Sequence, residues 1–331
     1  MKNIAFIINP ISGTLNKRRI PKIIDKLLDK EQWMPDIVFT EYKGHGIELA
    51  RHYGIPVINA DSRQIYRELK IGTAAPTDEQ LQQAHHYFVG TKSIHDYYNA
   101  SMYEQEVLDI ITSQTTQNTQ NATNTIHLLA GGSMMYIDAV CNGIDDIPTV
   151  RDDIREEMKR RYQEEGLEAL CADLQRLDPE HYAIVDRQNY RRVIHALEIC
   201  YQTGRTYTSF RTQAKKERPF RIVKIGINCE RDLLYNKINA RVDEMMEHGL
   251  LDEAEGLYEF RHQNALNTVG YKELFDYIDG RWSLDEAVER IKGNTRRYAR
   301  KQLTWFKRDE QMRWFRPDQK DEILKYIAQY E

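Results

Sequence analysis

The chain has 331 residues, of which 41% are apolar and 30% charged, with a formal net charge of −4. No apolar run approaches the roughly 20 residues of a membrane span, and no signal-peptide pattern follows Met1. The four cysteines are widely spaced and form no C-x-x-C pair, which argues against a zinc site. We therefore expect a cytoplasmic protein with free thiols, no membrane contact and no protein-bound metal, long enough for a large α/β domain with an insertion.

Charge is segregated along the chain. Residues 290–308 hold eight Lys or Arg and no acid, and 211–224 is also basic, whereas 151–170 is rich in Glu and Asp. A solvated helix face normally carries both signs, so the stretch at 290–308 favours contact with RNA over simple solvation.

Short apolar runs bounded by turn residues predict strands at 4–8, 36–40, 55–59, 126–130 and 222–228. Helical patterns lie between them, for example at 20–31, where the apolar residues share one face. This alternation is typical of a parallel sheet covered by helices. Residues 113–125 are polar and of low complexity, which predicts a surface loop.

The first strand leads into "INPISGTLNK" (8–17). A small-residue loop at the end of a strand is where many α/β enzymes hold a phosphate. Ser12, Gly13 and Thr14 offer hydroxyls and backbone amides for a weak phosphate nest. The alternative is that the run at 4–8 only fills a strand position.

Two later strands also end in polar turns. Val57 to Asn59 delivers Asp61 to the carboxyl edge of the sheet, and 126–130 is followed by Gly131, Gly132 and Ser133. Ligands of open α/β sheets bind at this edge, so the two turns predict a shared crevice. The alternatives are an Asp that only caps a turn and an ordinary tight Gly-Gly-Ser turn.

From about residue 48 to 315 the chain resembles the bacterial tRNA dimethylallyltransferases. The matching segments follow the family order: "ADSRQIYRELKIGTAAPT" (60–77), "HHYFVGT" (85–91), "YNASMYEQE" (98–106), "GGSMMY" (131–136), "RRVIHALEICYQTGRTYTSF" (191–210), "RVDEMMEHGLLDEAEGL" (241–257), "NTVGYKEL" (267–274) and "RKQLTWFKR" (300–308).

The resemblance implies transfer of a dimethylallyl group from dimethylallyl diphosphate to N6 of an adenosine next to the anticodon of tRNA, with Mg²⁺. Asp61 matches the general base of the family and Arg241 an arginine that clamps the diphosphate. Ser133 stands where the family usually has Thr. The target base must leave the anticodon stack to react.

The resemblance also implies contacts with the tRNA anticodon stem-loop. The matching positions are Ser62, Arg63, Gln64, Arg191, Arg192, His195, Thr268, Gly270, Tyr271, Lys272, Arg300, Lys301, Gln302, Thr304, Trp305 and Lys307. Tyr271, Trp305 and Phe306 supply aromatic surface in this reading, and the alternative is that they are core residues. Asn267 and Lys272 stand where many relatives carry Arg.

The family begins with a strand and a G-P-T-x-x-G-K-T phosphate loop, but no G-x-x-x-x-G-K-[ST] exists anywhere in this chain. Instead, "KNIAFIINPISG" (2–13) and "TEYKGHGIELA" (40–50) resemble the start of a diacylglycerol or related lipid kinase, without the G-G-D-G-T segment of that family. We therefore expect weak diphosphate binding and slow transfer.

The sequence thus predicts a monomer with a P-loop-NTPase-like parallel sheet core. Residues 1–50 form a lipid-kinase-like segment, 51–140 and 217–331 the α/β core, and 141–216 a helical insertion that binds tRNA. The predicted function is tRNA dimethylallyl transfer. A tRNA-binding protein without catalysis stays open as an alternative, and a lipid kinase is least favoured.

Overall fold

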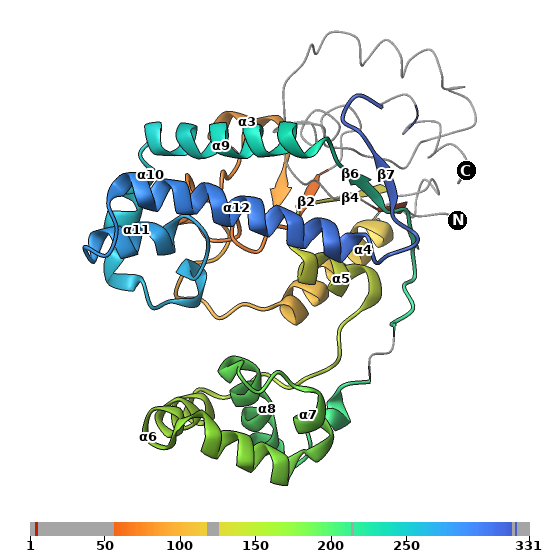
Figure 1. The fold of residues 1–331 in the computed structure, drawn as a ribbon. Coiled ribbons are helices and arrows are strands. Elements are labelled where there is room, and N and C mark those ends of the chain that lie inside the picture. Colours follow the sequence, from red (N-terminus) through yellow and green to blue (C-terminus); the bar gives the residue numbers. More distant parts are fainter. Residues whose placement is uncertain (1–3, 6–55, 118–125, 213–214, 320–321, 323–331) are drawn as a thin grey trace. The chain divides into compact units, whose positions relative to one another are not determined.

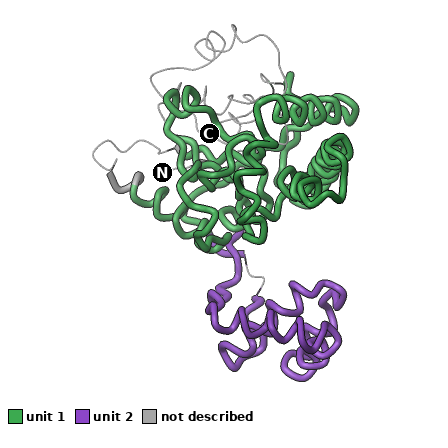
Figure 2. Tube along the Cα trace, turned by 90° about the vertical axis from the view of Figure 1, so that its left-hand side faces the viewer, with its two compact units in different colours: residues 1–141, 218–331 green, residues 142–217 purple. Residues whose placement is uncertain are grey.

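The computed structural model describes residues 4–5, 56–117, 126–212, 215–319 and 322 (Figure 1). The chain forms two compact units, one from residues 1–141 and 218–331 and one from residues 142–217 (Figure 2). The second unit spans almost the same residues as the insertion predicted at 141–216. The predicted phosphate nest at Ser12, Gly13 and Thr14, the helix at 20–31 and the strand at 36–40 lie outside the described residues.

The first unit is built on a parallel sheet, as predicted. Five strands follow the order β3-β2-β4-β1-β5, and every neighbouring pair is parallel. Their bounds are β1 Ile4–Ala5, β2 Val57–Asn59, β3 His86–Tyr87, β4 Ile126–Ala130 and β5 Arg221–Ile222. A second, two-stranded parallel sheet pairs β6 (Ile225–Ile227) with β7 (Arg313–Phe315). The sequence patterns did not predict β3 and β7, which have two and three residues.

The single strand predicted at 222–228 is wrong in one respect, because it is divided between the two sheets. β5 pairs with β1, whereas β6 pairs with β7. The change of partner occurs at Lys224, whose carbonyl accepts a hydrogen bond from the Arg313 N–H at 3.0 Å. The buried Lys224 side chain also pairs with Asp309 at 2.6 Å, which fixes the chain between the two strands.

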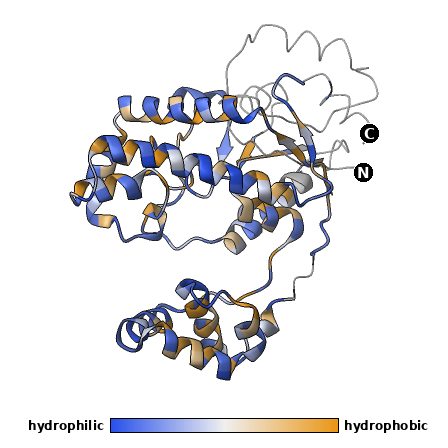
Figure 3. Ribbon diagram, in the orientation of Figure 1, coloured by the Kyte–Doolittle hydropathy of each residue, from blue (hydrophilic) through white to orange (hydrophobic). Residues whose placement is uncertain are grey.

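Seven α-helices of the first unit lie within the described residues: α3 Asp78–Gln83, α4 Ala100–Gln117, α5 Met134–Asn142, α9 Arg231–Glu247, α10 Leu250–Gly256, α11 Tyr271–Ile278 and α12 Leu284–Phe306. Blue and orange residues alternate along α9 and α12, as expected for helices with one buried face (Figure 3). These two helices pack through Leu234, Ile238 and Ala299.

Helix α4 continues to Gln117, so the loop predicted at 113–125 begins later than expected. Asn99 stabilises the start of α4 by accepting the Met102 N–H.

The second unit is helical, with its own core. It contains α6 Asp152–Leu177, kinked at Gly166 (φ 80°), α7 Pro179–Ile184 and α8 Tyr190–Thr203. Met158, Leu170 and Leu197 are among its fully buried residues. The buried Asp178 caps α7 and accepts hydrogen bonds from the backbone and hydroxyl of Thr208, which closes this small core. Across the described part of the chain, no helix is both long and apolar enough to cross a bilayer.

The carboxyl ends of β2 and β4 converge. The strands pair in register up to Asn59 and Ala130, and beyond them the Ser133 N–H donates to the Ala60 carbonyl at 3.1 Å. A Cβ added at Gly131 would lie 2.4 Å from the Ala60 carbonyl. Glycine is therefore required where the two strand ends meet.

A second junction holds the loop that follows Asp61. The Glu253 carboxylate on α10 accepts the backbone N–H groups of residues 70–72 at 2.8–3.1 Å, and also the Tyr271 hydroxyl at 2.6 Å. Burial, followed by the nearby Glu253 charge, raises the pKa of Tyr271, so its hydroxyl stays protonated and donates. Gly72 rests on the Tyr271 ring, where a Cβ would approach within 2.7 Å.

Replacing Gly131 with Ala should lower the free energy of unfolding by about 2 kcal/mol, because the new methyl group overlaps the Ala60 carbonyl. Gly256→Ala is the matched control, since an added Cβ there meets nothing within 4 Å at the end of α10. Urea unfolding followed by circular dichroism compares the two. Equal stability of both variants would show that the strand ends do not need glycine.

Glu253→Gln should cost about 3 kcal/mol, because the amide puts a donor opposite backbone N–H groups that need an acceptor. Glu255→Gln, an exposed change on the same helix, should alter stability by less than about 0.5 kcal/mol. The same urea titration measures both. A loss at position 253 no larger than at 255 would contradict the role of this carboxylate in fixing residues 70–72.

Candidate active site

A cavity of about 520 Å³ opens beside the converged ends of β2 and β4. It brings together Asp61, Ser133 and Arg241, the three residues predicted to act in the reaction. Its wall also includes several residues predicted to contact tRNA: Ser62, Arg63, Thr268, Gly270, Lys272 and Lys301. Segments far apart in the sequence thus meet at one edge of the sheet, the edge predicted for ligand binding.

Asp61 uses one carboxylate oxygen to shape its own turn. Its Oδ1 accepts the backbone N–H groups of Arg63 at 2.8 Å and Gln64 at 3.3 Å. Within the described residues Oδ2 has no hydrogen-bond partner, and Asp61 lines the cavity. The alternative of a capping Asp is therefore present in the structure, but it occupies only half of the carboxylate. The second oxygen can accept a proton from a ligand.

Ser133 ties the two strand ends together. Its buried hydroxyl accepts the Ser62 N–H at 2.8 Å and donates to the Ser62 hydroxyl at 3.0 Å. Arg241 approaches the same turn from α9. Burial lowers the pKa of Arg241, while the nearby carboxylates of Asp61 and Glu244 raise it and keep the guanidinium charged. The cavity therefore contains a carboxylate and a cation whose charges act on each other.

Tyr298 is a cavity residue that the sequence patterns did not indicate. Its phenol lies near the same groups: burial raises its pKa most, the Asp61 charge adds to this, and the positive charge of Arg63 and a hydrogen bond with Ser133 lower it. Its position within the basic stretch at 290–308 was the only available signal. A Tyr beside Asp61 can pack against an aromatic ligand or donate a hydrogen bond to it.

Several residues predicted to contact tRNA are used inside the protein. Tyr271 is fully buried, and Gln302 is buried with its amide donating to the Gly132 carbonyl at 2.7 Å. In this structure the polar atoms of both side chains bond inside the protein, so their predicted contact with tRNA stays a prediction. Phe306 is likewise a core residue. Trp305 is half-buried and donates to Asp138 at 2.8 Å.

The polar turn after Asp61 is also partly engaged. Arg63 donates to the carbonyls of Asn264 and Ala265 at 2.9 and 3.2 Å. Gln64 donates to the carbonyls of Thr73 and Ala74 at 3.0 and 3.3 Å. These bonds fix the shape of the cavity wall.

The remaining predicted contacts fall at two other places. Arg300, Thr304 and Lys307 line a separate pocket near the end of α12. Arg191, Arg192 and His195 lie on α8 of the second unit, where the His195 Nδ1 is 3.3 Å from the buried Glu198. Not every cation of 290–308 is free to contact RNA, because Lys292 pairs with Asp243 at 2.8 Å.

The described residues contain no group of three His, Cys, Asp or Glu side chains that could hold a metal ion. Among the residues that the structure describes, two carboxylates line the cavity, those of Asp61 and Glu273. Glu273 already accepts the Gly270 N–H at 2.9 Å and the Asn294 amide at 2.6 Å. These side chains alone therefore do not form a magnesium site.

Residues 64–309 match the family described as IPP transferase. The chain is 58% identical over 281 residues to tRNA dimethylallyltransferase 1 of Bacteroides thetaiotaomicron, covering 85% of this chain and 89% of that protein. It is 59% identical to tRNA dimethylallyltransferase 1 of Phocaeicola vulgatus, covering 85% of this chain and 92% of that protein.

Solved structures of tRNA prenyltransferases are also similar to this chain. The full-length tRNA isopentenylpyrophosphate transferase of Bacillus halodurans matches with a TM-score of 0.62 at 30% identity, covering 100% of this chain and 96% of that one. A eukaryotic dimethylallyltransferase acting on tRNA shares the fold, with a TM-score of 0.68 at 22% identity over 85% of this chain and 73% of that one. With the sequence match and the cavity at the sheet edge in agreement, the chain belongs to the IPP transferase family.

Proposed function

We propose that this chain transfers a dimethylallyl group from dimethylallyl diphosphate to N6 of an adenosine next to the anticodon of tRNA. The observation that supports this most directly is the cavity that joins Asp61, Ser133 and Arg241 in a chain of this family. The volume of about 520 Å³ is within the range of small-molecule sites and suits an adenine beside a five-carbon chain.

The reaction is a substitution at the allylic carbon. The N6 amine of adenine forms a bond to C1 of the dimethylallyl group while the bond from C1 to the diphosphate oxygen breaks. Asp61 takes the N6 proton on its open Oδ2, which makes the weakly nucleophilic amine reactive. The charge of the departing diphosphate is stabilised by Arg241, and the products are the alkylated adenosine and diphosphate.

The adenine must be displaced from the stacked anticodon loop to reach Asp61. Tyr298 supplies an aromatic face at the cavity, and Lys272 and Lys301 supply positive charge at its wall. These are the groups with which proteins hold splayed RNA bases and their phosphates. The exposed Arg191 and Arg192 of the second unit are further contacts for the anticodon stem-loop.

Mg²⁺ belongs to this proposal as a partner of the diphosphate. Magnesium in phosphate-transfer sites is commonly held by one or two carboxylates together with substrate phosphates and water. Because the cavity offers no group of three ligand side chains in its described residues, we propose that the ion enters bound to the diphosphate.

A second function stays in competition, namely tRNA binding without transfer. The observation that favours it is the absence of any G-x-x-x-x-G-K-[ST] phosphate loop from the sequence. In that case the chain would bind an anticodon stem-loop but leave dimethylallyl diphosphate unreacted, even when the diphosphate is in large excess.

Asp61→Asn should lower the rate of transfer by about 10²–10⁴-fold, because the amide cannot accept the proton. It keeps the oxygen that accepts the Arg63 and Gln64 N–H groups, so affinity for the stem-loop should change less than about twofold. Single-turnover transfer and fluorescence anisotropy measure the two effects. Transfer that persists at the wild-type rate would exclude Asp61 as the base.

Arg241→Gln should lower the rate of transfer at least about 100-fold and raise the KM for dimethylallyl diphosphate, because the leaving group loses its cation. Lys237→Gln, one turn earlier on α9 and outside the cavity, is the matched loss of charge and should change neither by more than about twofold. Steady-state kinetics at varied diphosphate concentration compares them. Similar kinetics for the two variants would contradict the assignment.

A further inference from the structure

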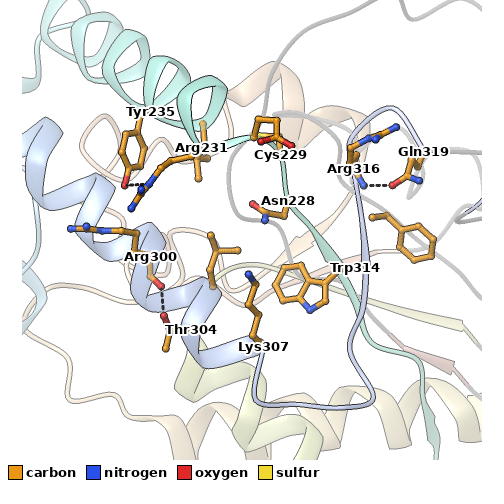
Figure 4. Close-up of a pocket in the computed structure, with 14 residues that line it drawn as sticks. Asn228, Cys229, Arg231, Tyr235, Arg300, Thr304, Lys307, Trp314, Arg316 and Gln319 are labelled. Carbon is orange, nitrogen blue, oxygen red and sulfur yellow. Dashed lines mark hydrogen bonds between the residues drawn. The ribbon is translucent and has the colours of Figure 1, made fainter.

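A second pocket of about 570 Å³ lies where α9 begins, α12 ends and the strands β6 and β7 end (Figure 4). It lies further along the two helices that also line the reaction cavity, toward the start of α9 and the end of α12. Arg231 is ten residues before Arg241 on α9, about 15 Å along the helix at 1.5 Å per residue. The two pockets are thus distinct sites on one pair of packed helices.

The pocket is cationic. Arg231, Arg300 and Lys307 line it, and among the described residues none of the three has a carboxylate within 4 Å. A fourth cation, Arg316, is paired with Asp318 at 3.1 Å, and Glu230 is the one acidic residue of the described wall. Three exposed cations that line one pocket favour an anion with several oxygens, such as a phosphate.

The start of α9 adds to this positive potential. Glu230 is the N-cap residue but makes no side-chain hydrogen bond to the first turn. The first N–H groups of this 17-residue helix therefore lie beside the pocket, and the N-cap side chain does not accept a hydrogen bond from them. The positive end of the helix dipole favours an anion there.

One side of the pocket is aromatic. Trp314 projects into it next to Lys307, and Tyr235 lies beside Arg231, whose Nε is 3.3 Å from the Tyr235 hydroxyl (Figure 4). Trp314 is held in place because its ring packs directly on the backbone of Gly226. A fixed aromatic ring beside a cluster of cations can hold a base and its phosphate together.

We infer that this pocket binds one nucleotide of the tRNA substrate outside the reacting adenosine, with its phosphate on Arg231, Arg300 and Lys307 and its base against Trp314. This inference rests on the proposed function. RNA is favoured over a free nucleotide because α12 is continuous between the two pockets, with Lys301 lining the reaction cavity and Arg300 lining this one. Arg231, Tyr235 and Trp314 are new contacts that no sequence motif indicated.

The test measures binding of an anticodon stem-loop by fluorescence anisotropy at several salt concentrations. The double variant Arg231→Gln, Lys307→Gln should bind about 20-fold more weakly, and its salt slope should fall by about 1.4, or 0.7 for each lost contact with a single strand. Both side chains are exposed, so the fold should be unaffected. The control Arg67→Gln, Lys70→Gln removes the same charge from exposed sites outside both pockets and should weaken binding less than about threefold.

A second measurement locates the phosphate. Replacing single loop phosphates with uncharged methylphosphonates should weaken wild-type binding about fivefold or more at one position, and this loss should vanish in the double variant. An abasic nucleotide next to that position should likewise cost wild type about tenfold but cost Trp314→Leu little. Trp314→Phe, which keeps an aromatic ring against Gly226, should restore part of the loss.

The outcomes separate the two proposals. If wild type binds and modifies the stem-loop but the double variant matches its control, the inference is overturned and the proposed function stands. If ADP binds wild type and binds the double variant more weakly, while both proteins bind the stem-loop equally well, the pocket is a free-nucleotide site. The inference is then again overturned. If wild type does not bind the stem-loop, both proposals fail.

Discussion

The junction between the ends of β2 and β4 is the constraint on which the rest of the site depends. Gly131 lies against the Ala60 carbonyl, and Ser133 bonds to Ala60 and to Ser62. These contacts leave Asp61, which lines the cavity, with one oxygen bound to its own turn and one without a hydrogen-bond partner among the described residues. Because the strands are parallel, two segments about 70 residues apart deliver their polar turns to the same place.

Around this junction the protein divides its polar groups into two sets. One set holds the cavity wall in shape: Glu253, Glu273 and Gln302 form hydrogen bonds with backbone groups, and the Tyr271 hydroxyl donates to Glu253. Groups such as Arg241, Lys272 and Lys301 line the cavity and can meet a ligand. Side chains that fix the wall use their donors and acceptors in hydrogen bonds within the protein. Side chains that bind a ligand must keep donors, acceptors or charges free for it. Sequence motifs contain both kinds of residue and do not distinguish them.

The extent of sequence prediction follows from this division. The parallel sheet and the crevice beside Asp61 and Ser133 were predictable, since apolar runs and polar turns are local patterns. The internal roles of Tyr271 and Gln302 were not, because they depend on partners at Glu253 and Gly132, far along the chain. Likewise, the division of the strand at 222–228 depends on the pairing of β7 near the other end of the chain. Tyr298 joins the site only through packing of α12 on α9.

Stabilising the charge of the departing diphosphate is the most demanding part of the proposed reaction. The chain has no G-x-x-x-x-G-K-[ST] loop, so in the proposed reaction Arg241 and the Mg²⁺ brought with the diphosphate would have to supply most of the charge stabilisation that such a loop provides. Charge stabilisation on a leaving group is usually the largest contribution to a rate of this kind. The proposed chemistry therefore depends less on Asp61 than on how the diphosphate is held.

The most direct measurement is single-turnover transfer of labelled dimethylallyl from its diphosphate to an anticodon stem-loop, with Mg²⁺ and the diphosphate at high concentration. Transfer to N6 that is lost in Asp61→Asn is the expected result, and it would mean that the cavity is a working active site. Stem-loop binding without any transfer would contradict this, and would show that the chain keeps the RNA-binding part of the enzyme without its chemistry.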